Sequence, residues 1–153
     1  MAAPEVEILL VEDSPEDVEL TIHTLRHHRL SNRIHVVGDG EEALDFLFCR
    51  GAYNDRSPEH PPKLVMLDLK LPKVDGLEVL QAIKGNAWTQ PIPVIVLTSS
   101  KEEFDLVKCY QLGVNSYIQK PVDFSQFQNV IHQLGMYWLL VNQPPPSELF
   151  HRS

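Results

Sequence analysis

Short apolar runs alternate along the chain with segments of helical periodicity. The runs predicted to be strands are residues 6–11, 34–37, 64–67, 94–97 and 116–119. This alternation favours an α/β fold with a parallel sheet. The first, third and fourth runs are almost entirely apolar, as expected for strands that helices cover on both faces. The second run is shorter and more polar, so we expect it at an edge of the sheet.

Polar and acidic residues mark the predicted starts of the helices. The segment Ser14-Pro15-Glu16-Asp17 offers an N-cap, a proline at the first helical position and acidic residues in the first turn. Ser99 and Ser100 each have a glutamate three residues later, and Asp123 opens the last helix. The polar loop 50–62 is longer than a compact α/β connection requires. A partner contact and a tolerated insertion both remain open for this loop.

Length and charge narrow the possible classes of protein. The chain has 153 residues, which suits one domain with a sizeable core. Its net charge is −8 and it has no Lys/Arg-rich run, so binding to nucleic acid or to an anionic membrane is not expected. The two cysteines, Cys49 and Cys109, have no metal or redox spacing, and no apolar stretch is long enough to cross a bilayer. We therefore expect a reduced, cytoplasmic protein.

Reactive side chains follow four of the predicted strands. Glu12 and Asp13 follow the first strand, Asp68 the third, Thr98 the fourth and Lys120 the fifth. The carboxyl ends of parallel strands lie at one edge of a sheet, where such folds bind ligands. The three carboxylates can bind Mg²⁺, and together with the hydroxyl and the ammonium they can support the transfer of a phosphoryl group. Singly, Asp13 has an ordinary explanation as a helix cap and Lys120 as a surface charge; their shared order and position favour a site.

The expected chemistry at this site centres on Asp68. Three neighbouring carboxylates repel one another, and a divalent cation would relieve that repulsion. Asp68 would attack phosphorus as a carboxylate nucleophile and form an acyl phosphate. Mg²⁺ and Lys120 would neutralise charge on the transferred group, and Thr98 could donate a hydrogen bond to one of its oxygens.

This ordered set resembles the receiver domain of two-component response regulators. The segment after Asp68, Leu71-Pro72-Lys73-Val74-Asp75-Gly76, resembles the family's loop into its third helix. The resemblance covers about residues 5 to 135. It implies a flavodoxin-like (βα)5 fold, a three-layer sandwich with parallel strand order 2-1-3-4-5. The apolar pattern of the last segment further predicts an extended C-terminal helix. We expect a receiver domain over residues 5–141 and a Pro-rich tail over 142–153, with no output domain.

The resemblance also implies roles for the site residues. Asp68 is expected to be the phosphoacceptor, and Mg²⁺ is expected on Glu12, Asp13, Asp68 and the backbone carbonyl of Lys70. The bond between Lys120 and Pro121 is expected to be cis, as it usually is in the family.

Signalling is expected to run through two switch residues. In receivers the phosphoryl group draws the threonine inward and an aromatic follows, which here points to Thr98 and Tyr117. The altered face would comprise helix 4, strand 5 and helix 5. An ordinary role for Tyr117 as a half-buried strand aromatic remains open.

The last helix suggests a partner surface. One apolar stripe, expected to pack on the sheet, comprises Phe124, Phe127, Ile131, Leu134, Trp138 and Val141. Val130, Tyr137 and Leu140 form a second apolar line that a monomer would leave exposed. We therefore expect a homodimer through this helix and the adjoining face of helix 4 and strand 5.

The predicted long helix, which includes Gly135-Met-Tyr-Trp-Leu139, and the loop 51–62 resemble the small regulators paired with bacterial and cyanobacterial phytochromes. This resemblance implies a red-light-sensing histidine kinase as phosphodonor. The family docks its kinase on the neighbourhoods that are here residues 15–28 and 121–125.

Three other functions compete with this interpretation. A haloacid-dehalogenase-type phosphatase also uses a strand-end aspartate with Mg²⁺, but it needs a second carboxylate two residues later, where this chain has Lys70. A flavodoxin-like cofactor carrier needs a phosphate loop after the first strand, and Glu12-Asp13 would repel that phosphate. A degenerate receiver would keep the site and act only as a binding module. We expect a receiver that phosphorylates and dephosphorylates itself and does not turn over a substrate.

Overall fold

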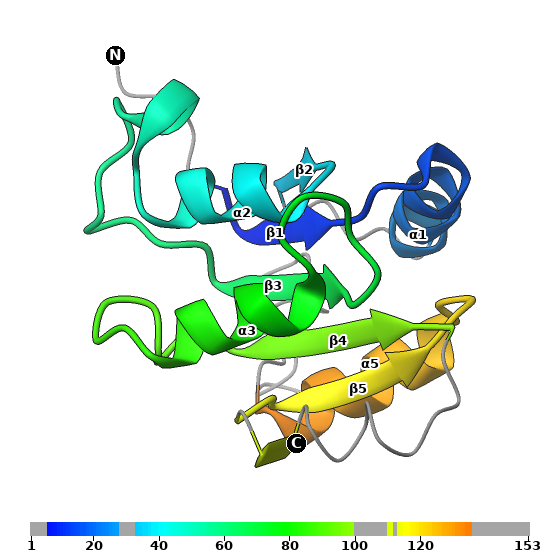
Figure 1. Ribbon diagram of the computed structural model, residues 1–153. Coiled ribbons are helices and arrows are strands. Elements are labelled where there is room, and N and C mark those ends of the chain that lie inside the picture. Colours follow the sequence, from blue (N-terminus) through cyan, green and yellow to red (C-terminus); the bar gives the residue numbers. More distant parts are fainter. Residues whose placement is uncertain (1–5, 28–32, 100–109, 112, 136–153) are drawn as a thin grey trace, which may run out of the picture.

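The computed structural model describes residues 6–27, 33–99, 110–111 and 113–135. Within these residues, five parallel strands form one sheet. The strands are β1 (Ile8–Val11), β2 (Ile34–Val37), β3 (Leu64–Asp68), β4 (Val94–Thr98) and β5 (Ser116–Gln119). Their order is β2-β1-β3-β4-β5, and all four pairings are parallel (Figure 1). The predicted fold class, strand order and edge position of residues 34–37 are confirmed.

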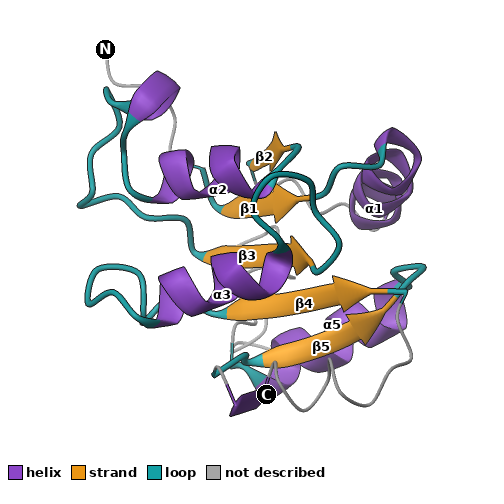
Figure 2. Cartoon of the chain, in the orientation of Figure 1, coloured by secondary structure: helices purple, strands orange, loops and turns teal. Residues whose placement is uncertain are grey.

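Helices cover both faces of the sheet (Figure 2). They are α1 (Pro15–His27), α2 (Gly40–Leu47), the short 3-10 helix η1 (Gly51–Tyr53), α3 (Gly76–Lys84) and α5 (Phe124–Gln133). Alternate strand residues divide the core: Val65 and Leu67 pack in the cluster with α2 and α3, whereas Leu64 and Met66 pack in the cluster with α1 and α5. Burial on both faces explains why β1, β3 and β4 are apolar at consecutive positions.

The strand boundaries differ slightly from the predicted ones. The first strand begins at Ile8, two residues later than predicted, while β3 and β4 each extend one residue further, to Asp68 and Thr98. Both added residues are buried. The candidate acceptor and the candidate switch threonine therefore belong to the sheet itself.

The last helix was predicted to run without a break past residue 135, but the described helix ends before that residue, and residues 136–153 lie outside the described part of the chain. The helix α5 ends at Gln133, Leu134 is its C-cap, and Gly135 has a φ of +71°. Glycine adopts this left-handed conformation readily, and it commonly ends a helix. Val130, predicted on an exposed line, is only 7% exposed and packs in the core beside Phe127 and Ile131. The rest of that line and of helix 4 lies outside the described residues.

The long loop after α2 packs against the domain through a cluster that we name the loop cluster: His35, Glu42, Phe46, Tyr53 and Arg56. The rings of His35 and Phe46 stack with centroids 4.8 Å apart, and Tyr53 meets Phe46 edge-on at 5.0 Å. The Arg56 guanidinium lies over the Phe46 ring, 3.7 Å from its centroid. The loop is therefore anchored to β2 and α2.

Across the residues that the structure describes, every helix is too short or too polar to cross a membrane.

Candidate functional site

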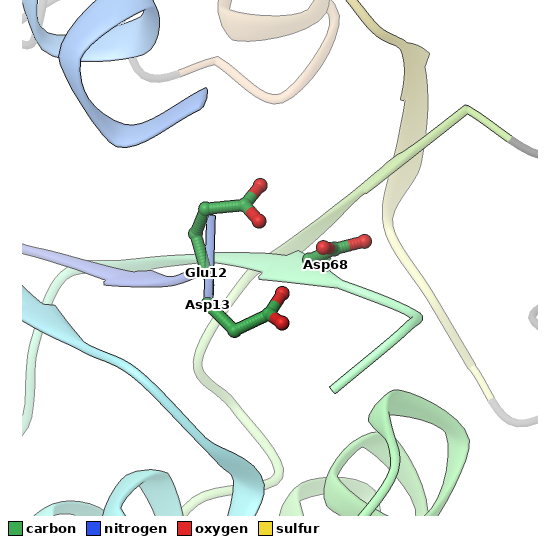
Figure 3. Close-up of side chains that lie close together, drawn as sticks. All are labelled: Glu12, Asp13 and Asp68. Atoms are coloured by element: carbon green, nitrogen blue, oxygen red, sulfur yellow. The ribbon is translucent and has the colours of Figure 1, made fainter. Parts of the chain in front are cut away.

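Three carboxylates meet at the carboxyl edge of the sheet. The register pairs Val11 of β1 with Leu67 of β3, so Glu12 and Asp68 follow at neighbouring positions. Carboxylate oxygens of Glu12, Asp13 and Asp68 all lie within 4.8 Å of one another, and Figure 3 shows the three side chains gathered in one place. Glu12 and Asp68 are buried, whereas Asp13 is exposed. The structure therefore brings these three predicted residues together.

The Lys120 ammonium lies within the same group. Its Nζ is 2.5 Å from Oε1 of Glu12 and 3.1 Å from Oδ2 of Asp68. The Lys120 backbone N–H donates to the carbonyl of Thr98 at 2.9 Å, which fixes the start of this segment against β4. The bond between Lys120 and Pro121 is cis, as the resemblance implied.

The two candidate switch residues lie on adjacent strands. Thr98 is buried at the end of β4, one residue beyond Leu97, which is the register partner of Asp68. Tyr117 is half-buried in β5 and packs against the cluster on the α2 and α3 face. Thr98 is thus beside the acceptor, whereas Tyr117 lies farther from the edge. The helix 4 segment predicted to move with them falls outside the described residues.

Lys70 contributes through its backbone to the geometry of Asp68. Its N–H donates to Oδ1 of Asp68 at 3.2 Å. Gly76, at the end of the same loop, packs closely against Asp68. A side chain would not fit there, because a Cβ would lie 2.4 Å from the carbonyl oxygen of Asp68. An open cleft beside the site is lined by Asp13, Leu69, Lys70, Leu71, Pro72, Asp75 and Leu77. Asp13 and Lys70 therefore face one cleft, which gives a small ligand a route to this edge.

Burial and charge perturb the ionisable groups in opposite ways. Burial raises the pKa of Glu12 to about 7, although the Lys120 ammonium partly offsets this effect. Burial alone would lower the pKa of Lys120, but its contacts with Glu12, Asp17 and Asp68 outweigh burial and raise it. The ammonium is therefore fully charged at neutral pH, while Glu12 is poised between its two forms.

These residues fit a hard divalent cation. Mg²⁺ prefers oxygen ligands and is usually held by one or two carboxylates together with waters. Three carboxylates within reach of one another provide such oxygens, and one of them faces solvent. Because the carboxylates outnumber the Lys120 ammonium, a cation would also relieve their mutual repulsion.

One participant was missed by the sequence reasoning. Oδ2 of Asp17, in the first turn of α1, lies 3.0 Å from the Lys120 Nζ. The sequence analysis treated Asp17 only as an acidic residue at a helix start. Its position four residues after Asp13, in a helix that leaves the same sheet edge, was the available signal.

Comparison with known proteins identifies the family. The model of the response regulator receiver domain matches residues 8–132. The chain therefore belongs to the response regulator receiver family and acts in two-component signalling.

Individual relatives agree with this assignment. The solved structure of the bacteriophytochrome response regulator AtBRR has a TM-score of 0.81 and 52% identity, over 92% of this chain and 100% of that one. The response regulator Rcp1 of Synechocystis sp. (strain ATCC 27184 / PCC 6803 / Kazusa) is 39% identical over 86% of this chain and 88% of its own. A crystal structure of Mn(2+)-bound Rcp1 has a TM-score of 0.73 and 37% identity, covering 93% and 99% of the two chains.

Another relative has a similar sequence identity to this chain but is described as having a different role. The probable methanogenesis regulatory protein FilR2 of Methanothrix harundinacea (strain 6Ac) is 38% identical over 90% of this chain and 86% of its own.

Proposed function

We propose that this receiver accepts a phosphoryl group from a sensor histidine kinase on Asp68, in a reaction that requires Mg²⁺. The observation that carries the proposal is the position of the Asp68 carboxylate. It is buried at the end of β3, with the Lys120 ammonium 3.1 Å away and oxygens of Glu12 and Asp13 within 4.8 Å.

The chemistry follows from these contacts. An oxygen of Asp68 attacks phosphorus, the bond from phosphorus to the donor breaks, and the donor leaves with the electron pair. The Lys120 ammonium offsets negative charge on the incoming group, because it already lies at the attacking carboxylate. Glu12, Asp13, Asp68 and the carbonyl of Lys70 are the groups that would hold Mg²⁺. When bound, the cation supplies further charge neutralisation.

Intact mass spectrometry after incubation with acetyl phosphate and Mg²⁺ tests this proposal. We expect one phosphoryl adduct on the wild type and none on Asp68→Asn or in the presence of a chelator. Asp45→Asn is a matched control, since this carboxylate pairs with Arg50 away from the site and should leave the adduct intact. An adduct of equal yield on Asp68→Asn would contradict the assignment of the acceptor.

The reaction is proposed to be stoichiometric. The acyl phosphate on Asp68 is hydrolysed by water, and no second carboxylate is positioned at residue 70 to act as the general acid of a phosphatase. With a large excess of acetyl phosphate, most of the protein should therefore accumulate as the phosphorylated form, because its hydrolysis lacks a general acid. Rapid release of phosphate with little accumulated adduct would favour the phosphatase alternative.

Thr98 and Tyr117 are proposed to carry the signal from Asp68 to β5. The support is the burial of Thr98 beside the acceptor and the half-buried position of Tyr117 on the next strand. We expect Thr98→Ala to retain the adduct and to lose the phosphorylation-dependent change in tyrosine fluorescence. An unchanged fluorescence response in this variant would remove Thr98 from the switch.

A phytochrome histidine kinase is the proposed phosphodonor. The support is the likeness to proteins described as bacteriophytochrome response regulators. In a transfer assay with several phosphorylated kinases, a red-light-sensing kinase should phosphorylate the chain at least tenfold faster than kinases with other sensors. Equal rates would leave the receiver assignment intact and refute this partner.

The proposed assembly is a homodimer through the β5 and α5 face. A groove there is lined by Tyr110, Ser116, Tyr117, Ile118, Gln119, Gln126, Asn129, Val130 and Gln133, and Tyr110 is exposed. Val130 is largely covered by the core, so the contact would depend on the other side chains. Light scattering over a dilution series should show a dimer at tens of micromolar; a monomer with and without phosphorylation would contradict it.

A further inference from the structure

Three carboxylates surround the Lys120 ammonium: those of Asp17 and Asp68 accept hydrogen bonds from it, and Glu12 forms an ion pair with it. An ammonium has three donors, and the structure places three acceptors around it. They are Oε1 of Glu12 at 2.5 Å, Oδ2 of Asp17 at 3.0 Å and Oδ2 of Asp68 at 3.1 Å. A phosphoryl oxygen that approaches Lys120 therefore competes with these carboxylates for the ammonium.

Asp17 differs from the other two acceptors. Glu12 and Asp68 belong to the candidate metal cluster and their side chains are 1% and 6% exposed, whereas the Asp17 side chain is 38% exposed. Asp17 is also on α1, a different element from the strand ends that supply the metal cluster. Its contact with Lys120 is the most accessible to water. It is therefore the weakest of the three contacts and the easiest to break.

The backbone of Asp17 is held in place independently of Lys120. Its N–H donates to Oγ of Ser14 at 3.3 Å, in the N-terminal turn of α1. The carboxylate is thus presented to Lys120 from a fixed turn, while the two buried carboxylates keep the ammonium in the site. Removing the Asp17 charge should free one donor without removing Lys120 from Asp68.

We infer that Asp17 is a positioning residue that competes with the phosphoryl group for Lys120 and so shortens the life of the phosphorylated state. The inference rests on the proposed role of Asp68 as acceptor. In formation, an Asp68 oxygen bonds to phosphorus and acetate leaves from acetyl phosphate. In decay, water attacks phosphorus, the Asp68 carboxylate leaves, and inorganic phosphate is released.

Competition from Asp17 weakens the contact of Lys120 with the phosphoryl group both before and after transfer to Asp68. Without the Asp17 charge, Lys120 has an N–H group available to bind acetyl phosphate, which is a dianion. The same N–H group can bind the phosphoryl group once it is on Asp68. Formation of the adduct should then be faster and its hydrolysis slower, each by about two- to fivefold, the size that one partly exposed ion pair supports. A purely structural role for Asp17 would alter stability and would not move the two rates in opposite directions.

The test compares rates of adduct formation and decay, by intact mass at fixed acetyl phosphate and Mg²⁺, in wild type, Asp17→Asn, Asp17→Glu and Glu16→Gln. Glu16→Gln is the matched control, because it removes one charge from the same turn at an exposed position. We expect Asp17→Asn to accelerate formation and slow decay, Glu16→Gln to behave as wild type, and Asp17→Glu to recover the wild-type rates.

Slower formation in Asp17→Asn would overturn the inference, because it would mean that Asp17 delivers Lys120 to the acceptor. Equal changes in Asp17→Asn and Glu16→Gln would overturn it as well, since they would reflect net charge alone. Neither result affects the assignment of Asp68, which fails only if the wild type forms no adduct or if Asp68→Asn still forms one.

Discussion

The acidic edge of the sheet and the loop cluster gather similar ionisable side chains, but they balance them differently. At the acidic edge, the Lys120 ammonium faces several carboxylates and cannot neutralise them all. In the loop cluster, the Tyr53 hydroxyl donates to Oε2 of Glu42 at 2.6 Å and lies 3.0 Å from Nε2 of His35. The polar groups of the loop cluster satisfy one another, whereas those of the acidic edge retain excess negative charge.

The pKa values express the same difference. In the loop cluster, burial lowers the pKa of His35 and raises the pKa of Tyr53 to about 12, so both side chains are neutral at physiological pH. At the acidic edge, burial raises the pKa of Glu12 to about 7, and its charge changes near physiological pH. Excess, adjustable charge is typical of a ligand site, while internally paired groups are typical of a structural contact.

The largest expected effect is structural and belongs to the loop cluster. Phe46→Ala removes the buried ring on which His35, Tyr53 and Arg56 pack, and should lower the free energy of unfolding by about 3–5 kcal/mol. Urea unfolding measures this loss. The folded fraction should still form the phosphoryl adduct; its loss in a folded variant would show that the two regions are not independent.

Lys120→Ala should have the next largest effect, because it leaves Glu12 and Asp68 buried without their ammonium. At pH 8 without divalent cations we expect a loss of about 3 kcal/mol in unfolding free energy, part of which Mg²⁺ restores. Lys73→Ala is the control, since Lys73 is exposed and its ion pair with Asp39 should contribute at most about 0.5 kcal/mol. Equal losses in both variants would contradict the picture of a cation held in a buried acidic group.

The affinity for Mg²⁺ should depend on pH through Glu12. Its folded pKa of about 7 lies above the ordinary value of 4.5, so the associated stability is complete below about pH 4.5 and is lost as the pH rises through 7. Cation binding opposes protonation, and affinity should rise about tenfold from pH 6 to pH 8. Calorimetric titration measures this; Glu12→Gln should bind more weakly and lose most of the dependence.

The smallest effect is expected for Tyr53→Phe. This change removes a hydroxyl that lies between Glu42 and His35, and it should cost about 1 kcal/mol of unfolding free energy while leaving Mg²⁺ affinity unchanged. Thermal unfolding with and without Mg²⁺ separates the two effects. A reduced response to Mg²⁺ would show that the loop cluster is coupled to the acidic edge.

The approximate positions of the strands were accessible from sequence because they depend on local patterns. Apolar runs located the strands, and parallel pairing then required Glu12, Asp13, Asp68 and Thr98 to share one edge. The resemblance supplied the strand order and the cis bond before Pro121, which local patterns alone do not determine.

The missed features depend on tertiary contacts. The pairing of Asp17 with Lys120 joins residues 103 apart, and the spacing of Asp17 from Asp13 indicates only that it lies near the same edge, not that it contacts Lys120. Val130 was misplaced because Phe127, Val130 and Ile131 form one broad apolar face, which was divided into two stripes. The length of the loop 50–62 was visible, but its anchoring required Phe46 and His35 to meet Tyr53 and Arg56 across three elements.

The most direct test of the central claim is to locate the phosphoryl group chemically. Treatment of the phosphorylated protein with borohydride reduces an aspartyl phosphate to homoserine, which peptide sequencing by mass spectrometry can place. The account predicts homoserine at position 68, dependent on Mg²⁺, and unmodified residues at positions 12, 13 and 17. Homoserine at position 13 or 17, or phosphate retained on a histidine, would contradict Asp68 as the acceptor.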